Sequence, residues 1–425
     1  MIAFIIALLL VLIISGLPIA IALLASSIVF FLLSGIPGTL LVQQMLGGTS
    51  SFVLVAIPLF VFAGQLMNNG GITRRIIRFC NALIGRSPGG LAQVNVLSNM
   101  VFAGISGEAV ADTAGLGSVL IPAMRKQGYS KEFSSGITAA ASLAGPIIPP
   151  SIPMIICASM AQVSVGKMFL GGAIPGLLFV AASMIYTYYI AVQRKFPRGD
   201  SFTFSELHAA FLDAFWALLA PVIIVGGLVS GVFTVSEAAV IAVLYVFVVG
   251  KFIYKEIDLK RVVAEGWYTV SLTGSIMIIL ATAKVYTYAL TVEQIAEVLT
   301  LSLTYLTSNA YVLFVLLIIV ALIIGSFLST TAGLLLMVPL LDPLVAQTAM
   351  DPVHFYVLIT VSLCIGTLTP PVGITLFLAS SLGEAAPEKV FMQAAPYILL
   401  LLVIIVAAMF IPEIVMWLPN LVYGS

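Results

Sequence analysis

Two short stretches of this 425-residue chain combine glycine, paired prolines and hydroxyl residues within apolar sequence. They read Gly-Pro-Ile-Ile-Pro-Pro-Ser-Ile-Pro at 145–153 and Gly-Thr-Leu-Thr-Pro-Pro-Val-Gly at 366–373. Proline lacks the amide hydrogen that a helix needs and clashes with the preceding turn, so each stretch predicts a broken helix. A broken helix offers carbonyl oxygens to a small cation at one half-helix end and amide hydrogens to an anion at the other. Both can be bound without a charged side chain in hydrocarbon, where such a charge is costly.

The composition indicates the medium in which these breaks lie. Hydrophobic residues make up 61% of the chain and charged residues 8%, with 17 basic and 17 acidic side chains. Soluble domains carry about 25% charged residues, so we predict an all-α integral membrane protein. No charge precedes Arg74, and this apolar start is expected to be mature structure rather than a signal peptide. No basic tract indicates a nucleic-acid partner.

Two pairs of apolar segments are too short to span a bilayer singly, because a spanning helix needs about 20 residues. Segments 91–104 and 108–124 meet at Ala-Gly-Ile-Ser-Gly, and segments 310–325 and 331–349 meet at Gly-Ser-Phe-Leu-Ser-Thr-Thr-Ala-Gly. We therefore predict two re-entrant helical hairpins. Their tips are expected at about 103–113 and 325–333, inside the membrane, where irregular backbone must be buried or line a watery cavity. Further apolar segments are expected at about 2–15, 17–34, 52–68, 133–160, 168–192, 214–234, 236–253, 269–288, 354–381 and 391–418.

The two halves of the chain repeat the same order of hairpin, helix and diproline break. Moving residues 145–178 forward by 221 positions superposes them on 366–399 without a gap. The superposed identities are Gly145, Pro149, Pro150, Ala158, Ser159, Ala173, Pro175 and Leu178 on Gly366, Pro370, Pro371, Ala379, Ser380, Ala394, Pro396 and Leu399. We predict a first repeat over 1–195, a connecting cytoplasmic amphipathic segment over 196–213 and a second repeat over 214–425.

The charged loops indicate that the repeats are inverted. The loop predicted at 70–90 carries Arg74, Arg75, Arg78 and Arg86, whereas its counterpart carries Glu293 and Glu297. Basic loops stay in the cytoplasm, so equivalent loops are expected on opposite sides of the membrane. Following the crossings outward places both termini on the periplasmic side. Inverted repeats with paired broken helices are typical of secondary transporters, whose sites lie at the repeat interface near the bilayer midplane.

Each hairpin tip is expected to face the break of its own repeat and to form a Na⁺ site there. Hydroxyl and carbonyl oxygens without a carboxylate cage suit Na⁺ better than Ca²⁺ or Mg²⁺. The predicted ligands of the first site are Gly104, Ser106, Gly107, Gly145, Ile148 and Pro149. Those of the second are Gly325, Ser326, Ser329, Thr330, Thr331, Gly366, Thr369 and Pro370. The predicted substrate contacts are Ser106, Asp112, Pro150, Ser151, Thr331, Pro371 and Gly373. The alternative is that these small residues only let helices pack closely.

Three charged residues keep two interpretations each. Glu108 and Asp112 are either proton-coupling carboxylates or residues that stabilise a helix N-terminus. Lys284 is expected near a helix end, where it either snorkels to the interface or contacts substrate. No nucleophile–base–acid constellation and no phosphate-binding GxxxxGK[ST] loop is present, and Cys80, Cys157 and Cys364 lack metal-ligand spacing. A transporter is therefore favoured over a membrane-embedded enzyme or a channel.

At these motifs the sequence resembles the large membrane subunit of tripartite ATP-independent periplasmic (TRAP) transporters. The matching stretches, spread over nearly the whole chain, are AIPLFVFAGQLM at 56–67, GISGEAVAD at 104–112, GSVLIPAM at 117–124, GPIIPPS at 145–151, GVFTVSEAA at 231–239 and TPPVG at 369–373. One departure is Glu108, where a small residue is expected, so the first tip is more polar than the resemblance implies.

The resemblance implies an elevator mechanism, in which a transport domain carries both hairpins across the membrane against a fixed scaffold. It implies Na⁺-driven import of an organic acid through the bacterial inner membrane, with Na⁺ as the coupling ion and no organic cofactor. A periplasmic substrate-binding protein would deliver the carboxylate, and a separate small four-helix membrane subunit would complete the scaffold. Sialic acid is the favoured substrate and a C4-dicarboxylate the next. The alternative is a stand-alone divalent-anion/Na⁺ symporter, or an efflux pump of related fold, that needs no binding protein.

Overall fold

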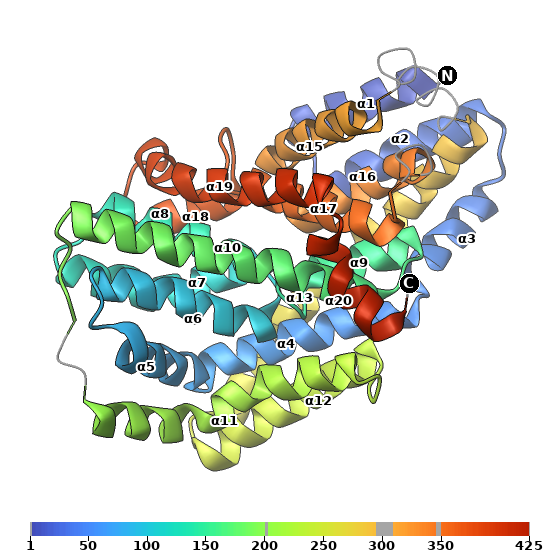
Figure 1. Cartoon of the computed structure of the whole chain (residues 1–425). Coiled ribbons are helices and arrows are strands. Elements are labelled where there is room, and N and C mark those ends of the chain that lie inside the picture. The colour runs from blue at the N-terminus through green and yellow to red at the C-terminus, as the bar shows by residue number, and fades with distance from the viewer. Residues whose placement is uncertain (1, 200–202, 295–308, 346–349, 425) are drawn as a thin grey trace.

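The computed structural model describes residues 2–199, 203–294, 309–345 and 350–424, and these fold into helices joined by short connections (Figure 1). The described part contains six helices that are long and apolar enough to cross a bilayer. The predicted all-α membrane class is confirmed. The six helical stretches are Phe52–Asn69, Val165–Gln193, Phe204–Val229, Val235–Ile253, Leu259–Val292 and Pro387–Phe410.

The helices of the first half have a counterpart series in the second half. The first half contains α1 (Ile2–Ile14), α2 (Ile19–Leu33), α3 (Gly38–Thr49), α4 (Ala56–Asn69), α5 (Ile72–Ile84), α6 (Gly90–Ser106), α7 (Ala109–Lys126), α8 (Lys131–Ala141), α9 (Ile152–Ala161) and α10 (Val165–Gln193). The second contains α11 (Phe204–Val229), α12 (Val235–Val248), α13 (Leu259–Val292), α15 (Ala310–Phe327), α16 (Thr330–Val345), α17 (Pro352–Gly366), α18 (Ile374–Gly383), α19 (Pro387–Phe410) and α20 (Glu413–Tyr423).

Each predicted hairpin tip contains a tight turn between two helices. The first turn joins α6 to α7 at Gly107, whose φ of 67° is left-handed and therefore favours glycine. The second turn joins α15 to α16 through Leu328 and Ser329. Both predicted broken helices are also interrupted, because α8 and α9, like α17 and α18, are separated by the two proline pairs. The hairpins enter from opposite ends of the molecule in Figure 1.

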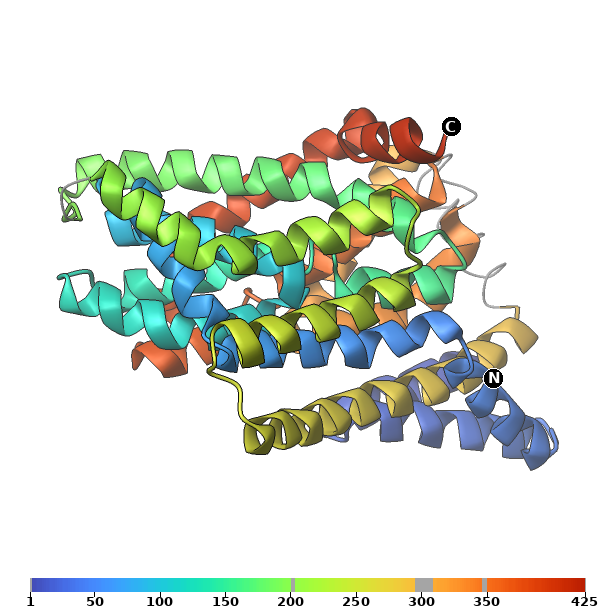
Figure 2. The ribbon, with the colours of Figure 1, turned by 90° about the horizontal axis from the view of Figure 1, so that it is seen from below.

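The two halves run in opposite directions, and helices of each half pack against helices of the other. α7 packs against α18, and its counterpart α16 packs against α9. The end of α18 reaches the connection between α7 and α8, where Lys131 Nζ donates to the Glu384 carbonyl (2.9 Å) and Arg125 lies 3.6 Å from the Glu384 carboxylate. The same packing between the halves recurs at the periphery, where α4 packs against α12 and α13 against α2 and α3 (Figure 2). The hairpins and half-helices thus form one packed unit.

Four elements differ from the sequence predictions. The expected loop at 70–90 contains α5, which the polar arginines obscured although Ile72, Ile76 and Cys80 bury one face at helical spacing. α3 occupies 38–49, where no element was predicted. The segment predicted at 391–418 is divided into α19 and α20 by Ile411 and Pro412. The connecting segment expected over 196–213 is helical from Phe204 and continues into the next span as α11, whereas residues 200–202 and Glu297 lie outside the described residues.

A cluster of charges fixes α5 to the segments around α11 and α13. Arg75 Nε donates to Asp213 (3.0 Å), its Nη1 donates to Glu256 (2.7 Å), and the guanidinium lies 3.8 Å from the centre of the Tyr254 ring. Burial opposes the charge of Arg75, but the hydrogen bonds to Glu256 and Asp213 outweigh it and raise the pKa of the guanidinium. This end of the molecule therefore has a fixed, paired cation.

Arg75→Ala is expected to lower the stability of the protein by about 2 kcal/mol, because it removes the guanidinium that Asp213 and Glu256 share and leaves them only the more exposed Arg78 and Arg74. Arg74→Ala is the matched control: the Arg74 side chain is 73% exposed, against 17% for Arg75, so its loss should cost under about 1 kcal/mol. Thermal unfolding of both variants in detergent measures the difference. Equal melting temperatures of Arg75→Ala and Arg74→Ala would contradict the inference that Arg75 stabilises this cluster of charges.

Candidate functional site

The first hairpin tip lies directly against the first break. A Cβ on Gly107 would come 2.4 Å from the Pro150 carbonyl oxygen, and the Gly107 carbonyl accepts a hydrogen bond from the Ile152 amide (3.2 Å). A Cβ on Gly104, one turn earlier, would lie 3.9 Å from the Pro149 carbonyl oxygen, an ordinary contact distance. The structure thus brings together the tip and the backbone oxygens predicted to share the first Na⁺ site.

Asp112 is the buried acid of this first tip. Its Oδ1 accepts a hydrogen bond from the Ser106 hydroxyl, and a Cβ on Gly145 would come 2.4 Å from its Oδ2. The side chain is fully buried, and Oδ2 has no hydrogen-bond partner within the described part of the chain. A buried carboxylate oxygen without a partner is costly, and a cation would compensate it. Asp112, which was predicted from the sequence to contact the substrate, therefore fits the first cation site.

Glu108 occupies the N-cap position of α7 without a side-chain cap hydrogen bond. It lines a small cavity of about 60 Å³ between the first tip and helices α4 and α13, together with Gln65, Asn68, Ser106 and Tyr268. This space holds a few water molecules but not an organic acid. Glu108 and Asp112 both lie at the start of α7, where the helix dipole favours a negative charge. This position agrees with the interpretation that they stabilise a helix N-terminus.

The second hairpin tip is tied to the second break by backbone hydrogen bonds. The Ser326 carbonyl accepts from the amides of Val372 (3.2 Å) and Gly373 (2.8 Å). The ends of α15 and α17 touch at two glycines, because a Cβ on Gly366 would come 2.5 Å from the Gly325 Cα. The residues predicted for the second Na⁺ site therefore meet at Gly325, Ser326 and Gly366.

Several predicted ligand hydroxyls already have partners. Ser151 Oγ donates to the Pro146 carbonyl (2.6 Å) and caps α9, and Ser329 Oγ caps α16 by accepting from Ala332. Thr369 donates to the Ile365 carbonyl (2.9 Å). Thr331 is the exception: its hydroxyl is buried and has no hydrogen-bond partner among the residues described. It is the predicted substrate contact whose hydroxyl is left for a ligand.

The two tips come together in the middle of the molecule. Cys364, just before the second break, forms a side-chain hydrogen bond with Thr330 at the second tip. α9 also packs against both α16 and α17. The two breaks differ in exposure, however. Pro149 and Pro150 are buried, whereas Pro370, Pro371 and Val372 are exposed.

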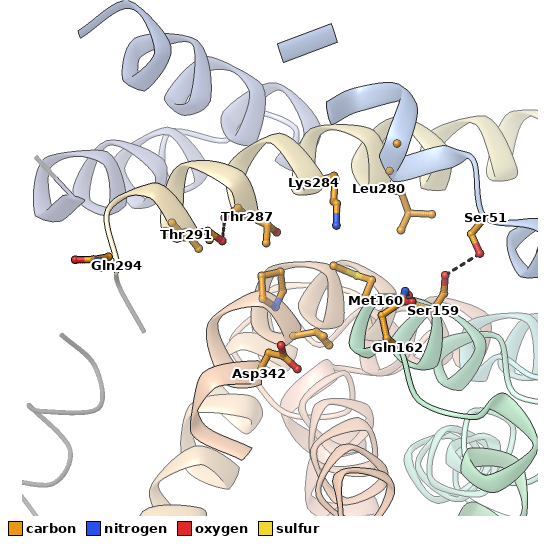
Figure 3. A pocket seen from close by; sticks show the side chains of 15 residues that line it. Ser51, Ser159, Met160, Gln162, Leu280, Lys284, Thr287, Thr291, Gln294 and Asp342 are labelled. Atoms are coloured by element: carbon orange, nitrogen blue, oxygen red, sulfur yellow. Dashed lines mark hydrogen bonds between the residues drawn. The ribbon is translucent and has the colours of Figure 1, made fainter. Parts of the chain in front are cut away.

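A cavity large enough for an organic acid lies away from the tips. Its volume is about 580 Å³, within the range of ligand pockets, and it separates α3 and α13 from α9 and α16 (Figure 3). We call it the α13–α16 cavity. Its lining residues are Gly47, Gly48, Ser51, Ser159, Met160, Gln162, Leu280, Lys284, Thr287, Leu290, Thr291, Gln294, Val338, Pro339 and Asp342.

Two groups of functional residues were missed in the sequence. Thr367 organises the second break, since its carbonyl accepts from the Thr375 (3.1 Å) and Leu376 (3.4 Å) amides, but only the fold shows this pairing. The second group is Thr287 and Thr291 on α13, which had a signal: they recur at helical spacing with Lys284, already considered as a substrate contact, in an apolar segment. Lys284 lies well inside α13 and lines a cavity, so the expectation that it sits near a helix end is wrong.

Comparison with known proteins places this geometry among transporters. Residues 6–414 match the family described as "Tripartite ATP-independent periplasmic transporter, DctM component". The chain is 35% identical over 411 residues to the sialic acid TRAP transporter large permease protein SiaM of Vibrio cholerae, covering 96% of each chain. It is 36% identical over 369 residues to the C4-dicarboxylate TRAP transporter large permease protein DctM of Pseudomonas aeruginosa, covering 87% of this chain and 86% of that one.

The fold is also similar to that of a solved transporter. The YdaH transporter of Alcanivorax borkumensis superposes with a TM-score of 0.60 over 87% of this chain and 86% of that chain, at 15% sequence identity. At this identity the likeness concerns the fold alone.

Proposed function

The chain belongs to the DctM component family of TRAP transporters, and from this premise we propose that it is the large membrane subunit of a sodium-coupled importer of an organic acid anion. The observation that carries the proposal is the pair of hairpin tips, each in backbone contact with a diproline break. Carbonyl and hydroxyl oxygens converge at both places, and Asp112 adds an unpartnered carboxylate oxygen at the first. Such oxygen-rich, helix-interrupting sites are suited to Na⁺.

The substrate class rests on the relatives and on the polarity of the tips. The two similar permeases are named for sialic acid and C4-dicarboxylates, both carboxylates. Between the tips, the N-terminus of α18 offers the positive end of its helix dipole to an anion, and the Thr331 hydroxyl offers a hydrogen bond. We favour N-acetylneuraminate as the substrate and succinate as the next candidate.

The partners and the orientation follow from the same proposal. A periplasmic binding protein would deliver the substrate, and a small four-helix membrane subunit would complete a fixed scaffold against which the hairpins move as an elevator. Arg75 pairs with Glu256, and the Gly199 amide donates to Gly85 (3.0 Å), so the basic segments of α5, the end of α10 and the start of α13 share one end. The positive-inside rule places that end in the cytoplasm of an inner-membrane protein and both termini in the periplasm.

Uptake by proteoliposomes tests this function. Vesicles containing this chain and the small membrane subunit are expected to accumulate N-acetylneuraminate or succinate only with an inward Na⁺ gradient and a loaded binding protein. Replacing external Na⁺ by K⁺ should abolish accumulation, and undiminished uptake would reject sodium coupling. Uptake that is the same without the binding protein would favour the stand-alone symporter.

A further inference from the structure

The α13–α16 cavity contains a cation that nothing in the described residues neutralises. Lys284 shares one face of α13 with Leu280, Thr287 and Thr291, at spacings of four, three and four residues, and points into the cavity in Figure 3. It forms no ion pair or side-chain hydrogen bond within the described part of the chain. A lysine in a partly enclosed cavity attracts an anion more strongly than it would in open water.

The opposite wall of the cavity carries an acid. Asp342 on α16 points into the same space, and its Oδ1 accepts a hydrogen bond from the Tyr356 hydroxyl (2.9 Å), which fixes its position (Figure 3). Lys284 and Asp342 do not pair with each other in the described structure. Ser51, Ser159 and Gln162 line the same cavity to one side of these two residues (Figure 3).

We propose that the α13–α16 cavity is a binding subsite for a carboxylate that also carries hydroxyl groups, with Lys284 holding the carboxylate and Asp342 accepting from the hydroxyls. A dicarboxylate fits less well, because its second negative charge would approach Asp342. The inference rests on the proposed function, since it gives the transported acid a second place to bind.

The position of the cavity relative to the tips suggests when this subsite is used. α9 and α16 each begin at a hairpin tip or break and end at the cavity, so the two places lie roughly 15 Å apart along these helices. In the proposed orientation the cavity is at the periplasmic end. The acid would therefore occupy this subsite before it reaches the tips.

Uptake kinetics of three variants test the role of Lys284. In proteoliposomes with both partners, Lys284→Gln is expected to raise the KM for N-acetylneuraminate about tenfold, which is the effect of losing one charged hydrogen bond. The maximum rate should stay within about twofold of the wild-type rate. Lys284→Arg keeps the charge and should retain most of the affinity. Lys167→Gln is the matched control, because Lys167 lies at the same end of the molecule, outside the cavity, and donates to the Gly424 carbonyl (3.3 Å). An unchanged KM in Lys284→Gln, or an equal rise in Lys167→Gln, would overturn the proposal.

Asp342→Asn tests the preference for a hydroxylated monocarboxylate. Removing this charge is expected to make succinate a stronger competitor of N-acetylneuraminate uptake. The succinate concentration that halves uptake should fall about fivefold, because charge repulsion is weakened by the effective dielectric constant near a protein surface. If succinate competes equally well against both proteins, Asp342 does not select against a second carboxylate and that part of the proposal is wrong.

Thiol labelling separates this inference from the proposed function. Thr287→Cys keeps Lys284 and, because Thr287 lines the cavity, should react with a membrane-impermeant anionic thiol reagent, whereas Cys80, Cys157 and Cys364 are buried. N-acetylneuraminate added to the purified chain is expected to protect Cys introduced at this position, and succinate to protect it less. Absent protection would overturn the subsite even if sodium-driven uptake is normal. Protection without any uptake by the wild-type complex would support the subsite and refute the importer.

Discussion

Gly366→Ala is expected to reduce sodium-driven uptake at least about 100-fold while the protein still inserts into the membrane. The new methyl group would lie 2.5 Å from the Gly325 Cα and 2.7 Å from the Leu322 carbonyl oxygen, and backbone atoms cannot rotate away. The end of α15 would have to move from α17. The Ser326 carbonyl would then separate from the Val372 and Gly373 amides, and the second tip would no longer face its break.

Gly226→Ala is the control for this experiment. Gly226 lies in α11, and a Cβ added there would meet no atom within 4 Å, so the same substitution should leave uptake at the wild-type rate. Membrane insertion of both variants is measured by their recovery in the membrane fraction, and folding by size-exclusion chromatography of the detergent-solubilised protein. A Gly366→Ala protein that elutes normally and retains more than half of the wild-type uptake would show that the contact between the glycines is not needed for transport.

Asp112→Asn is expected to raise the Na⁺ concentration for half-maximal uptake at least about tenfold. The substitution keeps the size of the side chain, but it removes the negative charge and can place an amide N–H donor where the unpartnered Oδ2 now lies beside Gly145. Ser106→Ala keeps the carboxylate and loses only its hydroxyl donor, so its effect should be smaller.

The Na⁺ dependence of uptake is compared with that of Glu388→Gln, which neutralises an exposed carboxylate in the first turn of α19. That control should have the wild-type Na⁺ dependence. If Asp112→Asn transports normally with an unchanged half-saturating Na⁺ concentration, Asp112 contributes no charge to the first cation site.

The sequence allowed the interruptions of the fold to be located, because proline and glycine act through local backbone rules. Pro149 and Pro370 mark the breaks in any context, and Gly107 marks a turn that needs a left-handed φ. The helical hairpins followed from segment length, and the reversal of the halves from the positions of the arginines. These are properties of short segments or of overall charge.

What the sequence did not reveal depends on contacts between distant residues. α5 was hidden because its arginines lower its average hydropathy, although Arg75 is paired with Asp213 and Glu256 from far along the chain. The hydrogen bonds from Val372 and Gly373 to Ser326 join residues more than 40 positions apart, and no local pattern encodes them. The large cavity likewise exists only where α13 and α16 face each other.

The unequal cover of the two breaks has a kinetic consequence. Pro221 of α11 closes over Gly104 so tightly that a Cβ there would come 2.7 Å from it, and the adjacent prolines are buried, whereas Pro370 and Pro371 are open at the surface. If sodium ions occupy the two breaks as we propose, we expect the ion at the open break to exchange with its surroundings in this conformation, and the ion at the covered break to exchange only after α6 and α11 part. On that proposal, loading and release would be sequential, with the covered ion the last to leave.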